Sequence, residues 1–298
     1  MHRWILPLIG LLIVPSWSLA AEPPPLRVFV SVLPLKYLVD RVGGTHVDTD
    51  VMVGPGQSPA TYEPTPRQMS RLGKTDLYFR VGVPFERVWI RRLADLNRNM
   101  SIIDLRDDLP LRRLEDHHHE DDGGAHREPH QESALDPHVW TSPTLASDMA
   151  RHICEALSAR DPRHAPDYQS GYETLAADLK NLDSRLRNRL AAIKNRKFLV
   201  FHPSWGYFAD AYGLEQIAIE NAGKEPGPRA LARVIALARQ ENIRIIFVQQ
   251  QFSRTTANTV ARAIGGKVVV VDPLAENYIE NLRRAADAFF LALDDRHE

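Results

Sequence analysis

The sequence LRVFVSVLPLKYLVDRV, residues 26–42, contains the first example of the pattern that decides the fold. Its first seven residues are mostly β-branched, aromatic or otherwise apolar, which is typical of a buried strand. A helical pattern follows at residues 34–42. Strand-like runs and helical patterns alternate in the same way further along the chain, and this alternation predicts parallel sheets covered by helices.

Two groups of four predicted strands divide the chain into two α/β lobes. The first group comprises residues 26–32, 47–53, 77–81 and 101–105, with helices near residues 34–42, 66–72 and 85–97. The second group comprises residues 197–201, 216–219, 243–248 and 267–271, with helices near residues 229–241, 255–264 and 276–293. We therefore expect an N-terminal lobe at residues 22–166 and a C-terminal lobe at residues 197–298, each containing a four-stranded parallel sheet.

A long amphipathic segment, residues 167–196, separates the two lobes. Apolar side chains recur in it at steps of three and four residues, namely Tyr172, Leu175, Leu179, Leu182, Leu186, Leu190 and Ile193. This spacing predicts one helix with one apolar face. From Asp167 to Lys194 such a helix is about 42 Å long, at 1.5 Å per residue, which is enough to run along both lobes. The alternative is an ordinary core helix within one lobe.

The N-terminus has the features of an export signal. Residues 1–4 carry one positive charge, residues 5–14 are almost wholly apolar, and residues 18–21 include the small side chains that a signal peptidase recognises. The apolar run is shorter than the roughly 20 residues that span a bilayer. We therefore expect residues 1–21 to be a cleaved signal peptide and the mature protein to be periplasmic.

The charge and the cysteine content narrow the class of protein. The formal net charge is −1, and basic residues are dispersed among acidic ones, so we expect no nucleic-acid partner. The single cysteine, Cys154, cannot form an intramolecular disulfide. It lies in a helical pattern, so we expect it to be a small buried apolar residue.

A histidine-rich segment at residues 115–131 interrupts the N-terminal lobe. It contains His117, His118, His119, His126 and His130 among acidic residues and glycine. Because it has too few apolar side chains to offset the entropy of ordering, we expect a mobile loop. Its imidazoles predict weak zinc binding, since a flexible loop loses entropy when it orders around a metal. The alternative is a solvated insert without a metal role.

Three metal-ligand side chains follow predicted strands, where parallel α/β sheets bind ligands. His202 directly follows the fifth predicted strand and Asp272 follows the eighth. His138 lies between the fourth strand and the next helix. Two imidazoles and one carboxylate suit zinc. His202 and Asp272 each precede proline, so either could instead be an ordinary turn residue.

Six short motifs carry a family resemblance. They are VLPL at 32–35, GPGQSPATYEPTP at 54–66, DPHVW at 136–140, FHPSWGYF at 201–208, GKEP at 223–226 and VDPL at 271–274. Together they resemble the zinc- and manganese-binding solute receptors of bacterial metal ABC transporters. The resemblance implies two α/β lobes joined by a long helix and one metal ion in the cleft between them. It also implies that His138, His202 and Asp272 are three of four metal ligands, and a histidine-rich loop is typical of the zinc receptors.

The fourth ligand position departs from the family pattern. The family usually has histidine directly before Thr-Tyr-Glu-Pro, whereas this chain has Ala60, whose methyl group cannot bind a metal. Glu63 turned inward, a water molecule or a histidine of residues 115–131 could take its place, and we expect water or Glu63. Gln249 is a second departure, at a position where the family commonly has glutamate.

We therefore expect a monomeric periplasmic solute-binding protein that captures a metal ion and delivers it to the membrane permease of an ABC importer. Two imidazoles and a histidine-rich loop favour zinc over manganese. One alternative is a periplasmic zinc buffer or chaperone. Another is a zinc hydrolase, since three protein ligands and a water form a catalytic zinc site. The sequence contains neither His-Glu-x-x-His nor Gly-x-Ser-x-Gly, so we do not expect an enzyme.

Overall fold

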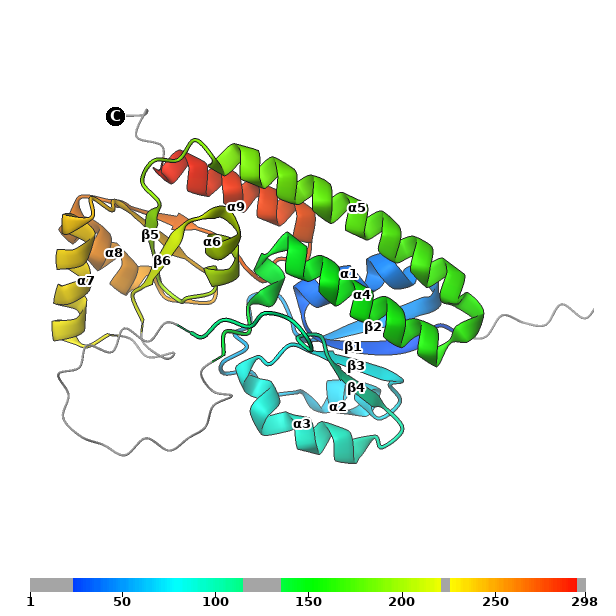
Figure 1. The fold of residues 1–298 in the computed structure, drawn as a ribbon. Helices are drawn as coiled ribbons and strands as arrows, with labels where there is room; N and C mark the ends of the chain where they lie inside the picture. The colour runs from blue at the N-terminus through cyan, green and yellow to red at the C-terminus, as the bar shows by residue number, and fades with distance from the viewer. Residues whose placement is uncertain (1–23, 115–134, 221–225, 294–298) are drawn as a thin grey trace, which may run out of the picture.

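The computed structural model describes residues 24–114, 135–220 and 226–293. The predicted signal peptide and the histidine-rich segment lie outside these ranges. Within them the chain forms two α/β lobes along one side of a long helix (Figure 1). None of the helices in the described ranges is both long and apolar enough to cross a bilayer.

The N-terminal lobe contains a parallel sheet with the strand order β2-β1-β3-β4. Its strands are β1 (Leu26–Val32), β2 (Val47–Val53), β3 (Leu77–Arg80) and β4 (Ser101–Asp104). Its helices are α1 (Leu33–Gly43), α2 (Pro66–Leu72), α3 (Pro84–Leu96) and α4 (Pro143–Arg160). All four predicted strands are confirmed, the last two ending one residue earlier than expected.

The C-terminal lobe repeats this topology with the strand order β6-β5-β7-β8. Its strands are β5 (Lys197–Val200), β6 (Glu215–Ala218), β7 (Ile245–Val248) and β8 (Lys267–Val270). Its helices are α6 (Gly206–Tyr212), α7 (Pro228–Gln240), α8 (Arg254–Ile264) and α9 (Tyr278–Leu293). The expected fold class is confirmed. The short helix α6, directly after the FHPSW motif, was not expected.

The strand orders decide where a ligand can enter. In each lobe the first strand is central, and the chain moves to one side of it before it crosses to the other. The two inner strands are β1 and β3 in one sheet and β5 and β7 in the other. In each sheet the loops that follow the two inner strands run in opposite directions and leave a crevice at the carboxyl end. Both crevices open toward the junction of the lobes, since residues that follow β2, β3, β5, β7 and β8 line one cavity there.

The linker helix α5 (Ala165–Leu190) serves both lobes. It packs against α1 and α4 of the N-terminal lobe and against α9 of the C-terminal lobe (Figure 1). The alternative of a core helix within one lobe is therefore wrong, although α5 ends four residues before the expected position 194. Gly171 permits close approach to α1, because a Cβ atom there would lie 2.4 Å from the carbonyl oxygen of Val42.

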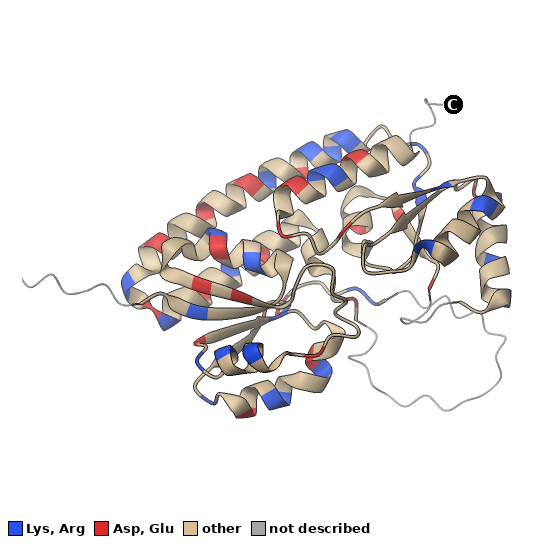
Figure 2. Ribbon diagram, turned by 180° about the vertical axis from the view of Figure 1, so that it is seen from behind, with Lys and Arg blue, Asp and Glu red and all other residues tan. Residues whose placement is uncertain are grey.

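The apolar face of α5 belongs to a hydrophobic core that extends from β1 to α9. A smaller cluster lies on the other side of the C-terminal sheet, beneath α7 and α8. Two buried hydrogen bonds also join the lobes: Trp140 Nε1 donates to the carbonyl oxygen of Pro273 at 2.7 Å, and the Tyr278 hydroxyl donates to that of Trp140 at 2.6 Å. Cys154 is buried and free, as expected. Acidic residues lie mostly in the N-terminal part of α5 and basic residues toward its C-terminal end, and residues of both charges are dispersed over both lobes (Figure 2).

Candidate metal centre

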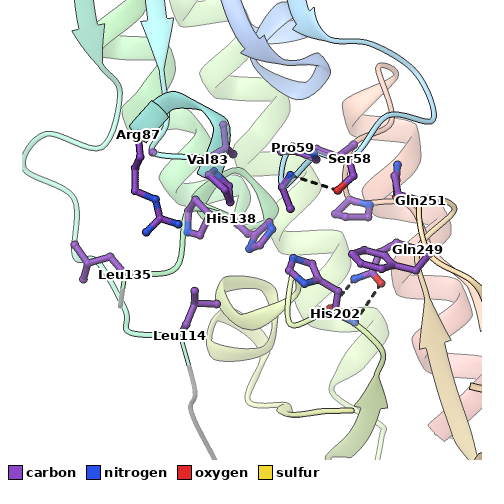
Figure 3. Close-up of a pocket in the computed structure, with 17 residues that line it drawn as sticks. Ser58, Pro59, Val83, Arg87, Leu114, Leu135, His138, His202, Gln249 and Gln251 are labelled. Atoms are coloured by element: carbon purple, nitrogen blue, oxygen red, sulfur yellow. Dashed lines mark hydrogen bonds between the residues drawn. The ribbon is translucent and has the colours of Figure 1, made fainter. Parts of the chain in front are cut away.

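A cavity of about 80 Å³ lies between the two lobes (Figure 3). Its polar lining side chains include His138 and Arg87 from the N-terminal lobe and His202, Gln249 and Gln251 from the C-terminal lobe. Proline, leucine, valine and alanine form most of the remaining wall. A water molecule needs roughly 10–15 Å³ of such volume, so the cavity has room for more than one ion with a single water.

His138 reaches the cavity from the segment before α4. It is only 8% exposed, and its Nδ1 lies 2.7 Å from Oδ1 of the fully buried Asp136. Because a carboxylate accepts, Nδ1 carries the hydrogen and the Nε2 lone pair is left for a metal. Burial lowers the pKa of His138, although Asp136 acts in the opposite direction. The ring is therefore neutral at neutral pH, which metal binding requires.

His202 reaches the same cavity from the loop after β5. Its Nδ1 lies 2.5 Å from Oε1 of Glu220, which lies two residues after the end of β6 and is 6% exposed. Its ring also stacks on Phe252, with centroids 5.1 Å apart. The ring is thus held at one edge by a carboxylate and over one face by an aromatic side chain.

The two imidazoles lie next to each other, and each has its Nδ1 on its own carboxylate. Their ring centroids are 5.2 Å apart with the planes at 76° (Figure 3). A carboxylate on one ring nitrogen and an open position on the other is the usual arrangement of metal-binding histidines, since it holds the tautomer and increases ligand basicity. The structure therefore brings together two of the three strand-end residues expected from the sequence.

Asp136 and Glu220 were not identified as site residues from the sequence. Asp136 belongs to the DPHVW motif, two residues before His138. Glu220 follows a strand end and so meets the criterion that selected His202 and Asp272. Its strand was predicted, but its pairing with His202 depends on β6 lying beside β5.

Gln249, whose role the sequence left open, holds the main chain of the His202 loop. Its side chain is 1% exposed, and Nε2 donates to the carbonyl oxygen of His202 and to the Ser204 hydroxyl, both at 2.6 Å. Its Oε1 accepts from the backbone N–H of His202 at 3.4 Å. Gln249 therefore ties the loop after β5 to the end of β7.

Asp272 does not reach the cavity wall. Its Oδ1 accepts from the backbone N–H of Leu274 at 2.9 Å, which closes the Asp-Pro turn, and from Gln251 Nε2 at 3.4 Å. Gln251, not Asp272, lines the cavity. Among the residues that the structure describes, no three His, Cys, Asp or Glu side chains lie close enough to share a metal ion. Two of the three expected ligands thus line the cavity, and Asp272 as a ligand stays a prediction.

Glu63 also differs from its expected position. It is exposed and absent from the cavity wall, whereas the neighbouring Tyr62 is buried and donates a hydrogen bond to Gln68 Oε1 at 2.6 Å. Ala60 does line the cavity, as the resemblance implied. The five histidines of residues 115–131 lie outside the described residues.

A sequence model described as "Zinc-uptake complex component A periplasmic" matches residues 28–290. The high-affinity zinc uptake system protein ZnuA of Bacillus subtilis is 28% identical over 251 residues, which cover 84% of this chain and 78% of that protein. The zinc-binding lipoprotein AdcA of Streptococcus pneumoniae strain R6 is 25% identical over 90% of this chain, which spans about half of AdcA, 54% of its length.

Solved structures agree with this match. A crystal structure of ZnuA superposes with a TM-score of 0.82 at 32% identity, over 91% of this chain and 100% of that one. A ZnuA deletion mutant with zinc bound has the same TM-score at 33% identity and covers 91% of this chain and 99% of its own.

Proposed function

Because the chain belongs to the family of the periplasmic zinc-uptake complex component A, we propose that it is a receptor that captures zinc between its lobes and delivers it to the permease of an ABC importer. The observation that carries this proposal is the His138–His202 pair in the interlobe cavity, with each Nδ1 on a buried carboxylate. The names of ZnuA and AdcA support zinc as the metal, and two imidazole ligands favour it over manganese.

The proposed ligand set begins with Nε2 of both histidines and adds Asp272 as the third ligand. Only Oδ1 of Asp272 is engaged by the turn, and Gln251 lies between its carboxylate and the cavity. Gln251 donates to this carboxylate and lines the cavity, so we expect its side chain to move aside when Asp272 binds the metal. The fourth position lies beside Ala60 and is taken by a ligand from outside the protein, in the simplest case water. Glu63 is exposed and outside the cavity wall, so it would have to turn inward to reach this position.

The arrangement favours binding over catalysis. Each buried carboxylate beside a histidine, Asp136 or Glu220, already accepts from that ring. Neither is therefore available as a general base for a metal-bound water, which a zinc hydrolase needs. We propose that residues 1–21 direct export to the periplasm, that residues 22–166 and 197–298 are the two lobes, and that residues 167–196 connect them.

Zinc affinity of the mature chain tests the ligand assignment. In competition with a chelator, with less than one equivalent of zinc, we expect one tight site. His202→Ala should weaken it at least about 100-fold, the upper end of the effect of losing only an outer-shell partner. His152→Ala, on helix α4 outside the cavity, is the matched control and should leave the affinity unchanged. Equal affinities for the two variants would show that His202 is a turn residue without a metal role.

A reconstituted permease and ATPase tests delivery. The zinc-loaded receptor should increase ATP hydrolysis by the transporter, whereas zinc-loaded His202→Ala protein at the same zinc concentration should not. A wild-type protein that binds zinc tightly but leaves ATP hydrolysis unchanged would favour a zinc buffer or chaperone.

A further inference from the structure

Arg87 is a cationic side chain in the wall of a cavity that we assign to a cation (Figure 3). It lies in the first turn of α3, where the chain leaves the central strand β3. Within the described part of the chain, Arg87 has no carboxylate or hydrogen-bond partner. Its side chain is exposed, so solvent screens part of its charge. It would still repel a metal cation in the same cavity, and an anion between the two would remove this repulsion.

Two carboxylates of the described residues lie near the start of α3, and both are engaged elsewhere. Glu86 is fully buried and accepts from the backbone N–H groups of Gly82 at 2.8 Å and Val81 at 3.1 Å, and it pairs with Arg80 at 3.3 Å. Asp104 pairs with Arg106 at 2.7 Å. Glu86 thus secures the turn between β3 and α3, and this turn presents the next residue, Arg87, to the cavity.

The cavity wall beside Arg87 also borders the fourth coordination position of the proposed zinc site, for which no protein ligand was identified. It is formed by Pro59, Ala60, Val83 and Pro84, and none of these side chains can bind zinc. The proposed protein ligands come from the segment before α4 and from the C-terminal lobe. Among the described residues, then, no side chain on this wall can complete the zinc site, and a ligand from outside the protein can take the position between the metal and the guanidinium.

We propose that the cavity takes zinc together with a small carboxylate, which binds zinc at the position beside Ala60 and accepts hydrogen bonds from Arg87. The inference rests on the proposed function and specifies its ligand. A carboxylate fits because its two oxygens match the planar fork of arginine and can also bridge to a metal. The cavity volume of about 80 Å³ exceeds what one water in the fourth position needs.

The proposal requires zinc and the carboxylate to strengthen each other's binding by the same factor. Acetate is the probe, because it supplies one carboxylate and chelates zinc weakly. Zinc affinity of the full mature chain is measured by chelator competition in two buffers of equal ionic strength, one with acetate and one with perchlorate. For the wild type, acetate should increase zinc affinity about tenfold.

Arg87→Gln should abolish this increase. In perchlorate buffer the same variant should bind zinc more tightly than the wild type, because it removes a positive charge from the cavity. Arg91→Gln, one turn further along α3 and outside the cavity wall, is the matched control and should behave as the wild type in both buffers. In a chloride buffer zinc affinity should increase much less than in acetate. Chloride is a single atom, whereas acetate can place one oxygen on zinc and the other on Arg87.

An equal response of Arg87→Gln and wild type to acetate, or an equal increase with chloride, would overturn the inference while tight zinc binding persists. Failure of the wild type to bind zinc tightly in either buffer would contradict the proposed function itself, and this inference with it.

Discussion

His138 and His202 obtain their orientation in two different ways. The partner of His138, Asp136, is two residues away, so a short turn is enough to set Nδ1 against its carboxylate. The partner of His202, Glu220, is 18 residues away and arrives only because β6 pairs with β5. His202 is also held by Gln249 from β7. The orientation of His138 therefore depends on a local turn, whereas that of His202 depends on the assembly of β5, β6 and β7.

Ala60→His should increase zinc affinity, because Ala60 lines the cavity and an imidazole there supplies a fourth nitrogen. A tenfold gain corresponds to about 1.4 kcal/mol, which also adds to the free energy of unfolding at saturating zinc. Chelator competition measures the affinity, and the zinc-dependent shift in Tm measures the stabilisation. Ser58→His, in the same loop, is the comparison. If Ala60→His leaves zinc affinity unchanged or lower, the loop after β2 does not approach the metal as proposed.

Gln249→Leu should weaken both the fold and the zinc site. It removes three hydrogen bonds to the His202 loop and leaves the His202 carbonyl without this donor, which costs about 1–3 kcal/mol of unfolding free energy. Zinc affinity should fall as well, because the His202 ring loses its position. Gln250→Leu, the exposed neighbour, is the control. Urea denaturation and chelator competition give the two readouts, and loss of stability with unchanged zinc affinity would restrict Gln249 to a structural role.

At the scale of elements, α5 and α9 lie side by side and connect the lobes through side chains rather than through main chain alone (Figure 1). The buried leucines of α5 pack in the same core cluster as Phe289 of α9 and the strands of both sheets. The hydrogen bonds of Trp140 and Tyr278 add polar contacts at the same junction. Free hinge motion of one lobe would break these contacts, so we expect small movements around the metal instead of wide opening.

Leu182→Ala in the middle of α5 should lower the free energy of unfolding by about 2–5 kcal/mol, the usual cost of a cavity at a fully buried leucine. Because the core around it is shared, tryptophan signals from both lobes, Trp89 in α3 and Trp205 before α6, should shift to lower urea together. Arg185→Ala, on the exposed side of the same helix, is the control. A shift confined to one lobe would show that α5 stabilises that lobe alone.

The whole molecule combines a small buried ligand pair with a surface on which basic and acidic side chains are dispersed (Figure 2). Its lobes are similar in topology, and each contributes one imidazole to the cavity, so the site exists only where the lobes meet. Affinity for a metal and contact between the lobes are therefore coupled: zinc bound to both imidazoles stabilises the junction that brings them together.

Deletion of residues 115–131 should remove weak zinc sites and leave the tight one. This expectation follows from the five histidines in that segment and from the separate pair in the cavity. Calorimetric titration of the full mature chain should show at least two classes of zinc site, and the deletion variant should retain only the tight class. Loss of the tight class would mean that a histidine of the deleted segment completes the cavity site.

The sequence by itself determined the elements and the family, because both depend on local order. Strand runs such as residues 26–32 and 47–53 and the apolar stripe of residues 175–190 are periodicities within one element, and they were found in place within a few residues. The expectation that ligands bind after the carboxyl ends of parallel strands likewise selected His138 and His202. Once a strand is located in the sequence, the residues that follow it are known as well.

Only the tertiary structure decided which side chains meet. The order β6-β5-β7-β8 places Glu220 and Gln249 on either side of His202, and β3 at the centre of its sheet carries Arg87 to the cavity. Asp272 and Glu63 were expected at the metal; in the structure a turn engages one oxygen of Asp272, and Glu63 is exposed outside the cavity wall. Their roles as ligands stay predictions. The direction of a loop side chain depends on packing against segments that are distant in the sequence, so it cannot be predicted from a local periodicity.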